Sequence, residues 1–436
     1  MSKLKFRVEP GGTLRGTLRV PGDKSISHRA IMLGSLSEGV TEVSGFLEGE
    51  DSLATLAAFR AMGVPIEGPE HGRVRIEGVG LHGLRAPDRP LDLGNSGTSM
   101  RLLAGLLAGQ PFDTVLTGDA SLSRRPMRRV IEPLTRMGAR IEATEAGTAP
   151  LKIHGGRKLH GIDYVLPMAS AQVKSCVLLA GLYAEGRTCV TEPAPTRDHT
   201  ERMLAGMGWP IDIAGPKRCL EGGHVLQPCR IDVPADISSA AFFLVGASIA
   251  AGSELVLEHV GINPTRTGVI DILRAMGADI TLTHAREVGG EPVADLRVRS
   301  APLHGIAIAE ELVPLAIDEF PALFVAAACA EGETVLTGAE ELRVKESDRI
   351  QVMAEGLTAL GIEAVPTPDG IRIRGGRLRG GRVDSHGDHR VAMAFAVAAL
   401  RADGPIEIDD CANVNTSFPG FVELAHAAGL RIRAIS

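Results

Sequence analysis

The sequence has few aromatic residues: Phe, Trp and Tyr make up 3% of its 436 residues. Proteins that bind single-stranded nucleic acid stack bases on aromatic side chains, and little of that material is present here. The net charge of −7 and the lack of a long basic run also disfavour a nucleic-acid partner. The core must therefore be aliphatic, with Gly and Ala allowing close packing.

Closely spaced cysteines and long apolar runs are also missing. The six cysteines form no C-x-x-C motif and no zinc spacing. We expect Cys176, Cys189 and Cys329 to be buried thiols, while Cys219 and Cys229 could in principle pair with each other. The first residues lack the hydrophobic core of a signal peptide, and no apolar stretch reaches the length of a membrane span. We expect a reduced, soluble, cytoplasmic protein without a membrane partner.

What the chain does contain is a repeat. Six times a helix-like stretch ends at a glycine that is followed by a strand-like stretch, as expected for a helix C-terminus with a left-handed residue. The six glycines are Gly63, Gly138, Gly208, Gly277, Gly361 and Gly429.

A second shared feature lies upstream of each glycine, where a polar cluster opens an apolar helix. These helices are hydrophobic on all sides, which is typical of core helices. They should begin near Ser27, Ser99, Gln172, Ser238, Phe320 and Val391. Each unit then reads as buried helix, strand, second helix and strand. If the core helices are parallel, their polar clusters meet at one end.

Six units in a chain of this length suggest two domains of three units each. Strand-like segments precede Pro21, and the middle of the chain falls near Pro234. We therefore predict one domain from residues 1–21 and 235–436 and another from residues 22–234, with hinge crossings near 21 and 234.

The stretch Gly22–Arg29 illustrates the polar openings, since it places Lys24, Ser25 and Arg29 at the start of a helix. A helix N-terminus favours anions through its unpaired N–H groups and its dipole. Several cations share such positions, which indicates binding of phosphate or carboxylate, although each could instead form a surface ion pair. They are Lys24, Arg29, Arg101, Arg124, Arg125, Lys345, Arg349 and Arg390.

Two carboxylates interrupt these patterns. Asp318 follows an apolar run directly before a buried helix, so it is either a helix N-cap or a base that acts on a substrate hydroxyl. Glu346 lies among alternating cations and anions in Arg343–Arg349. It is either part of a surface ion-pair lattice or a proton donor.

Three other motifs are too incomplete to predict a site. His386 and His389 lack a third metal ligand at a suitable spacing, so we expect no metal. Gly22–Ser25 lacks the spacing of a phosphate-binding P-loop, and no G-x-S-x-G nucleophile motif occurs. We expect no cofactor.

Six segments together resemble the 5-enolpyruvylshikimate-3-phosphate (EPSP) synthase family, and the resemblance extends over essentially the whole chain. The segments are Gly22–Arg29, Leu93–Arg101, Arg125–Met127, Ser170–Gln172, Arg343–Arg349 and Asp388–Arg390. The resemblance implies an α/β fold, a two-domain inside-out α/β barrel of six βαβαββ units with buried parallel helices. It places the active site in the cleft between the domains.

The resemblance also implies a reaction, the transfer of the carboxyvinyl group of phosphoenolpyruvate to the 5-hydroxyl of shikimate-3-phosphate in chorismate and aromatic amino acid biosynthesis. Asp318, Glu346 and Lys24 would be catalytic. Shikimate-3-phosphate would be bound by Lys24, Ser25, Arg29, Ser170, Ala171, Gln172, Asp318 and Lys345. Phosphoenolpyruvate would be bound by Lys24, Asn95, Gly97, Arg125, Gln172, Arg349 and Arg390. These small molecules are the expected partners of a monomer.

The sequence departs from the best-known bacterial members at several positions. Thr416 replaces a donor-side Lys, Glu341 stands where many members have Asn, and Arg197 replaces an aromatic residue and would help to bind the substrate phosphate. These features resemble a class with reduced glyphosate sensitivity. Gly97, in contrast, leaves room for glyphosate, which favours inhibition.

Two rival functions remain open. A related enolpyruvyl transferase acts on UDP-N-acetylglucosamine, but that family carries a reactive Cys or Asp on a loop; the segment Gly118–Pro126 has no Cys, although Asp119 is present. A ring of six repeats could also enclose DNA, which the acidic charge disfavours.

Overall fold

The computed structural model describes residues 4–435 and divides into two compact units. One unit contains Gly22–Val233. The other contains the described residues up to Pro21 together with those from Pro234 onward, so the N-terminal strands belong with the second half of the chain.

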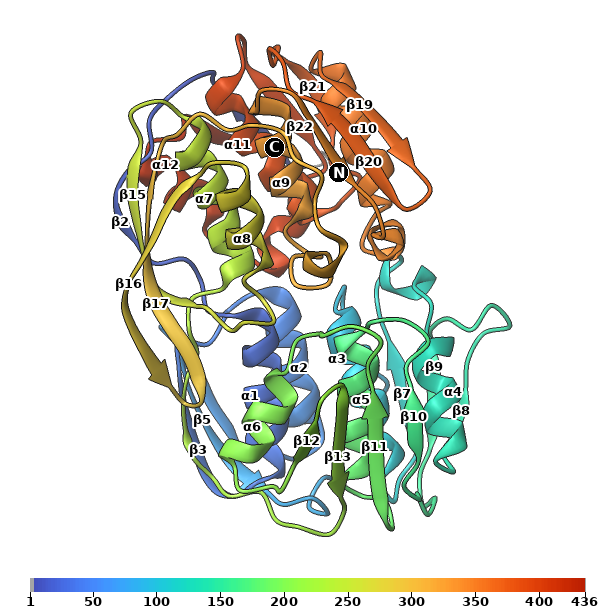
Figure 1. Ribbon diagram of the computed structural model, residues 1–436. Coiled ribbons are helices and arrows are strands. Elements are labelled where there is room, and N and C mark those ends of the chain that lie inside the picture. The colour runs from blue at the N-terminus through green and yellow to red at the C-terminus, as the bar shows by residue number, and fades with distance from the viewer. Residues whose placement is uncertain (1–3, 436) are drawn as a thin grey trace. The chain divides into compact units, whose positions relative to one another are not determined.

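The Gly22–Val233 unit alternates helices with short strands (Figure 1). Its helices are α1 (Lys24–Leu36), α2 (Glu50–Ala61), α3 (Gly97–Ala108), the 3₁₀ turn η1 (Leu122–Arg124), α4 (Arg128–Arg136), α5 (Ala171–Gly181) and α6 (His199–Gly206). Its strands are β3 (Glu38–Ser44), β4 (Ile66–Glu70), β5 (Arg73–Val79), β6 (Leu91–Asp92), β7 (Thr114–Thr117), β8 (Arg140–Glu142), β9 (Leu151–His154), β10 (Asp163–Val165), β11 (Arg187–Thr191), β12 (Asp212–Ala214), β13 (Lys217–Glu221) and β14 (Arg230–Asp232).

The other unit follows the same plan (Figure 1). Its helices are α7 (Ile237–Ile249), α8 (Gly268–Ala275), η2 (Glu310–Leu312), α9 (Phe320–Cys329), η3 (Glu340–Val344), α10 (Arg349–Ala359), α11 (His389–Ala398), η4 (Ala399–Arg401), η5 (Ala412–Thr416) and α12 (Phe421–Ala428). Its strands are β1 (Lys5–Val8), β2 (Arg15–Leu18), β15 (Glu254–Gly261), β16 (Asp279–Val288), β17 (Glu291–Arg299), β18 (Glu333–Leu336), β19 (Glu363–Thr367), β20 (Gly370–Arg374), β21 (Gly381–Asp384), β22 (Ile406–Asp409) and β23 (Ile432–Ile435).

The repeat is visible in the sheets. Each sheet of the first unit has one parallel strand pair followed by two antiparallel pairs, in the orders β14-β3-β5-β4, β6-β7-β9-β8 and β10-β11-β13-β12. The second unit repeats this plan in β21-β22-β1-β23 and β2-β15-β17-β16. In the sheet β18-β20-β19 a single parallel bridge from Ala307 to Val335 takes the place of the first strand.

The repeat glycines behave as the sequence predicts. Gly63, Gly138, Gly208, Gly277, Gly361 and Gly429 all have positive φ, between 82° and 117°. Only glycine adopts this backbone without strain, so it can end each helix and turn the chain into the next strand.

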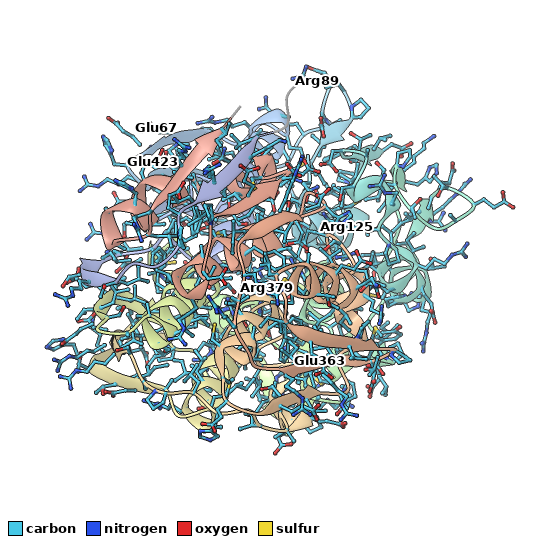
Figure 2. All side chains as sticks on the ribbon, turned by 90° about the horizontal axis from the view of Figure 1, so that it is seen from above. Glu67, Arg89, Arg125, Glu363, Arg379 and Glu423 are labelled. Atoms are coloured by element: carbon cyan, nitrogen blue, oxygen red, sulfur yellow. A yellow bond between two sulfur atoms is a disulfide. The ribbon has the colours of Figure 1, made fainter. Side chains whose placement is uncertain are left out.

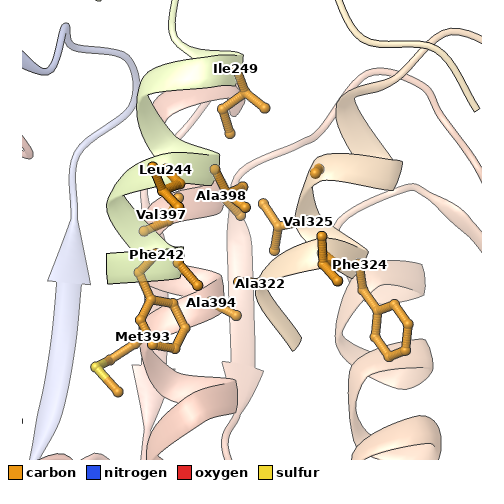
Figure 3. Close-up of a cluster of buried hydrophobic side chains, with 14 of the residues drawn as sticks. Phe242, Leu244, Ile249, Ala322, Phe324, Val325, Met393, Ala394, Val397 and Ala398 are labelled. Carbon is orange, nitrogen blue, oxygen red and sulfur yellow. The ribbon is translucent and has the colours of Figure 1, made fainter. Parts of the chain in front are cut away.

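One apolar helix from each repeat lies in the core. Every residue of α7 is buried, and α9 and α11 pack against it and against each other through side chains such as Phe242, Val325 and Ala394 (Figure 3). Strands pack against these helices, as β15 and β17 do against α7. In the part of the chain that the structure describes, no helix combines the length and the apolar character needed to cross a membrane.

The cysteine prediction was partly wrong. Cys189 is not a free thiol; it forms a disulfide with Cys219, so the fully reduced state expected from the sequence is not what the structure shows. The antiparallel register of β11 and β13 sets these residues opposite each other. Cys229, the other candidate partner of Cys219, is a free thiol, and Cys329 is only half-buried.

Gly105 tests the close packing of the core helices. A Cβ at Gly105 of α3 would lie 2.1 Å from the backbone oxygen of Cys176 in α5, whereas a Cβ at Gly206 of α6 would meet nothing within 4 Å. We expect Gly105→Ala to destabilise the protein by about 1–3 kcal/mol because the helices must separate. Gly206→Ala should leave stability equal or higher. Urea unfolding followed by circular dichroism would measure both, and equal midpoints would contradict the packing argument.

Candidate active site

In the Gly22–Val233 unit, hydrogen bonds join the starts of α1, α3 and α5. Asp23, Ser96 and Ser170 cap these helices, each accepting a hydrogen bond from a backbone N–H of the first turn. Between α3 and α5, Arg101 donates to Gln172 Oε1, and Gln172 Nε2 donates to Thr98 Oγ1 at 3.1 Å. Arg29 of α1 also donates to Ser175 of α5 at 2.9 Å, so the polar clusters of this unit meet.

Arg125 and Asn95 form a second part of this end. Arg125 donates to the side-chain oxygen of Asn95 at 2.6 Å and to its backbone oxygen at 3.1 Å. Arg125 is only 7% exposed, in contrast to the exposed Glu67, Arg89 and Glu363, which are labelled with it in Figure 2. A Cβ at Gly97 would lie 3.0 Å from Arg125 Nη1. The chain therefore approaches the guanidinium so closely that a side chain at this position would require Arg125 to shift by a few tenths of an ångström.

The cations of α1 are held by other groups of the same unit. Lys24 forms an ion pair with Asp51 of α2, a buried residue that the sequence analysis did not single out. Arg29 donates to Thr200 Oγ1 at 2.7 Å, to Ser175 Oγ at 2.9 Å and to the Ser25 carbonyl at 2.9 Å. Much of the guanidinium of Arg29 is thus occupied by protein groups. Ser25, in turn, accepts a hydrogen bond from Arg197 at 3.4 Å.

In the other unit, one arginine organises the site. Arg349, at the start of α10, is fully buried. It donates to Asp388 Oδ2 at 2.9 Å, to Glu346 Oε2 at 2.6 Å and to Asp318 Oδ1 at 3.3 Å. Although burial opposes its charge, the carboxylates of Asp388, Glu346 and Asp318 raise the pKa of Arg349. Burial also opposes the charge of Asp388, but Arg349 lowers the pKa of that carboxyl.

The remaining predicted residues of this unit, Lys345 and Arg390, contact Asp318, which is one of the partners of Arg349. Lys345 Nζ lies 3.6 Å from Asp318 Oδ1 and 3.7 Å from Glu341 Oε1. Arg390 donates to the backbone oxygen of Asp318 at 3.2 Å. The structural interpretation of Asp318 as a helix cap was wrong, because the N-cap of α9 is Glu319. Asp318 lies one residue earlier, between Lys345 and Arg349.

Two further residues that the sequence analysis named, Thr416 and His389, lie in this unit. The hydroxyl of Thr416 donates to the Asn413 carbonyl at 2.7 Å. His389 is buried in the first turn of α11. Among residues 4–435, no group of three or more His, Cys, Asp or Glu side chains is arranged to hold a metal ion.

The two units together contain every residue that was predicted to bind substrate or to act in catalysis. Lys24, Ser25, Arg29, Asn95, Gly97, Arg125, Ser170, Ala171, Gln172 and Arg197 lie in the Gly22–Val233 unit. Asp318, Lys345, Glu346, Arg349 and Arg390 lie in the other. Sequence reasoning missed Asp51, Asp119 and Asp388 as partners. The Asn95 amide donates to Asp119 at 2.8 Å. Asp119 and Asp388 lie in segments that the sequence analysis quoted, Gly118–Pro126 and Asp388–Arg390, whereas Asp51 lies in none of them.

Capped helix starts that carry cations, together with carboxylates beside buried arginine, define an α/β enzyme for small anionic substrates. The family model described as EPSP synthase (3-phosphoshikimate 1-carboxyvinyltransferase) matches residues 8–424. The chain belongs to the EPSP synthase family.

Relatives named 3-phosphoshikimate 1-carboxyvinyltransferase support this assignment. The chain is 76% identical to the protein of Alkalilimnicola ehrlichii, over 98% of this chain and 96% of that protein. It is 74% identical to the protein of Methylococcus capsulatus, over 98% of both. A solved EPSP synthase structure from Acinetobacter baumannii matches with a TM-score of 0.89 at 60% identity, over 99% of this chain and 100% of that one.

His28 gives a test of the electrostatics at the start of α1. It is fully buried, and its Nδ1 lies 2.8 Å from Thr55 Oγ1. Burial, and then the charges of Lys24 and Arg29, lower the pKa of His28 well below 6.5. In the unfolded chain the same residue binds a proton near its ordinary pKa.

Stability should therefore fall as the pH drops below about 6.5, because only the unfolded state gains this proton. The contribution of His28 approaches about 1.4 kcal/mol per pH unit. We expect His28→Gln to reduce the slope of unfolding free energy between about pH 7 and pH 5. His160→Gln, at an exposed position, is the control. Identical slopes in wild type and His28→Gln would contradict a neutral buried imidazole.

Proposed function

We propose that this chain transfers the enolpyruvyl group of phosphoenolpyruvate to the 5-hydroxyl of shikimate-3-phosphate and releases phosphate. The observation that carries the proposal is the pair of carboxylates, Asp318 and Glu346, on one buried guanidinium, that of Arg349. Membership of the EPSP synthase family and the names of its relatives supply the substrates.

The reaction requires an acid and a base. The 5-hydroxyl oxygen bonds to C2 of phosphoenolpyruvate and loses its proton, while the methylene carbon gains a proton. The resulting tetrahedral intermediate then loses that methyl proton and the phosphate group. We assign Asp318 as the base for the hydroxyl and Glu346 as the acid for the methylene carbon. Lys24 would assist proton transfer.

The cations would neutralise the substrates. Phosphate and carboxylate groups bind well to forked guanidinium groups and to helix N-termini. We propose the two sets of residues already given for each substrate, with Arg197 on the phosphate of shikimate-3-phosphate. Lys24, whose present partner is Asp51, would exchange that carboxylate for substrate oxygens.

The finer architecture is part of the same proposal. Buried helices with sheets outside them support an inside-out α/β barrel in each unit. We propose that the two units are domains hinged near residues 21 and 234, and that both sets of residues serve one reaction. Domain closure would exclude water before the reactive intermediate forms. We also propose that the protein is cytoplasmic and monomeric. Gel filtration of the purified chain would test the oligomeric state.

Glu346→Gln tests the assignment of the acid. In a phosphate-release assay with both substrates, we expect the wild type to turn over. The variant should have a kcat lower by about 10²–10⁴-fold, because the amide cannot donate the proton. Binding of shikimate-3-phosphate, measured by calorimetry, should persist.

Glu340→Gln, an exposed glutamate of η3, is the matched control and should turn over normally. Unchanged turnover in Glu346→Gln would remove Glu346 from the mechanism. Turnover of wild type with UDP-N-acetylglucosamine in place of shikimate-3-phosphate would instead favour the rival transferase.

Gly97→Ala tests the donor site. The added methyl would lie 3.0 Å from Arg125 Nη1 and 3.2 Å from Arg101 Nη1, so both guanidiniums must shift slightly. We propose that glyphosate inhibits this enzyme by occupying the space beside Gly97. The variant should then raise the glyphosate inhibition constant far more than the KM for phosphoenolpyruvate. Gly206→Ala should change neither constant, and equal changes of both in Gly97→Ala would refute the idea.

A further inference from the structure

A buried ion cluster lies behind the substrate residues of the Gly22–Val233 unit. Lys174 of α5 is fully buried, and its Nζ lies 3.0 Å from Glu192 Oε1 and 2.7 Å from Glu201 Oε1. Arg218 of β13 approaches the same two carboxylates at 3.9 Å and 3.7 Å. Two cations and two anions thus balance, with Lys174, Glu192 and Glu201 buried and the Arg218 side chain 16% exposed.

The two carboxylates flank the segment that carries Arg197. Glu192 follows β11, and Glu201 lies in the first turn of α6. One ammonium group therefore holds both ends of the segment Glu192–Glu201 against α5. The hydroxyl of the buried Thr196 also donates to Glu192, directly before Arg197.

The segment depends on such side-chain contacts because its backbone has few N–H groups that can donate hydrogen bonds. Pro193 and Pro195 have no N–H to donate. Beyond the ion cluster, Thr200 Oγ1 lies 2.8 Å from Ser175 Oγ, the neighbour of Lys174 on α5. The start of α5 carries Ser170, Ala171 and Gln172, so the segment is fixed to the same helix that presents proposed substrate ligands.

Stability alone does not explain these charges. Apolar residues of similar volume often stabilise a core as well as or better than a buried ion cluster does. An ion cluster differs in fixing the relative positions of its members, since each charge requires its partner. Here the members are remote in sequence, and Glu192 and Glu201 bracket Arg197 along the chain. Arg197 Nη1 reaches Ser25 Oγ at 3.4 Å.

We infer that Lys174 is a positioning residue that fixes Arg197 for the phosphate of shikimate-3-phosphate. The inference rests on the proposed function. Lys174 is fully buried against Glu192 and Glu201, and it acts through them on the segment between them. Its loss should therefore weaken the binding of one substrate and spare the other.

The first experiment compares Lys174→Met with Lys152→Met, an exposed lysine of the same unit. We expect Lys174→Met to raise the KM for shikimate-3-phosphate about tenfold, since small displacements of binding groups have large effects. The KM for phosphoenolpyruvate and kcat should change little, and Lys152→Met should match wild type. Equal increases in both KM values would overturn the inference.

A second variant separates positioning from folding. Lys174→Met combined with Glu201→Gln restores the balance of buried charges, with Arg218 opposite Glu192. Its melting temperature should recover towards wild type while the KM for shikimate-3-phosphate stays raised. Recovery of that KM together with the melting temperature would show a purely structural role. This variant also replaces the single one if that fails to fold.

A double-mutant cycle supplies the decisive comparison. Arg197→Ala should raise the same KM, and adding the charge-balanced change to Arg197→Ala should have little further effect, because the positioned group is already gone. Additive effects would overturn the inference. Wild type tests the proposed function separately, since absence of turnover with both substrates would refute that function, whatever the variants do.

Discussion

The structure depends on a balance of charge at the starts of buried helices. In the Gly22–Val233 unit, hydrogen bonds join residues near the starts of α1, α3 and α5, and the sequence adds lysine and arginine near these starts. Such a concentration of positive charge is unfavourable without anions. The chain supplies them itself: Asp51 pairs with Lys24, and Asp388, Glu346 and Asp318 surround Arg349. Under the proposed function, substrate oxygens would replace the Asp51 carboxylate on Lys24.

The repeat explains how units of the same architecture can present different polar residues at their helix starts. Five of the six core helices begin at a residue whose side chain caps the helix, and glycine ends the second helix of each repeat. These positions meet the same backbone requirement each time, so they vary little between units. The first turns are free to differ. The first turn of α1 carries Lys24 and Ser25, that of α5 presents Gln172, and α11 begins beside Asp388 and Arg390.

The fold was largely predictable, and the site less so. Helix starts were predicted up to three residues late; α1, for example, begins at Lys24 rather than Ser27, because Asp23 caps it and the polar first turn is already helical. Asp318 was found because it interrupts an apolar run, Glu346 because it lies among alternating charges, and the cations because they lie at helix starts. Lys174 escaped notice, since a single lysine in an apolar helix gives no sign of partners 18 and 27 residues further along the chain, at Glu192 and Glu201.

The sequence by itself determined the periodic elements, the glycine-ended helices and the residue types that bind anions. These follow from local rules, because hydrophobic period, helix caps and positive φ are properties of neighbouring residues. Only the tertiary structure decided which charge meets which. The pairing of Cys189 with Cys219, of Lys24 with Asp51, and of Arg349 with three carboxylates depends on strand register and helix packing. Strand register and helix packing bring these side chains together, and their separation along the chain does not predict the contact.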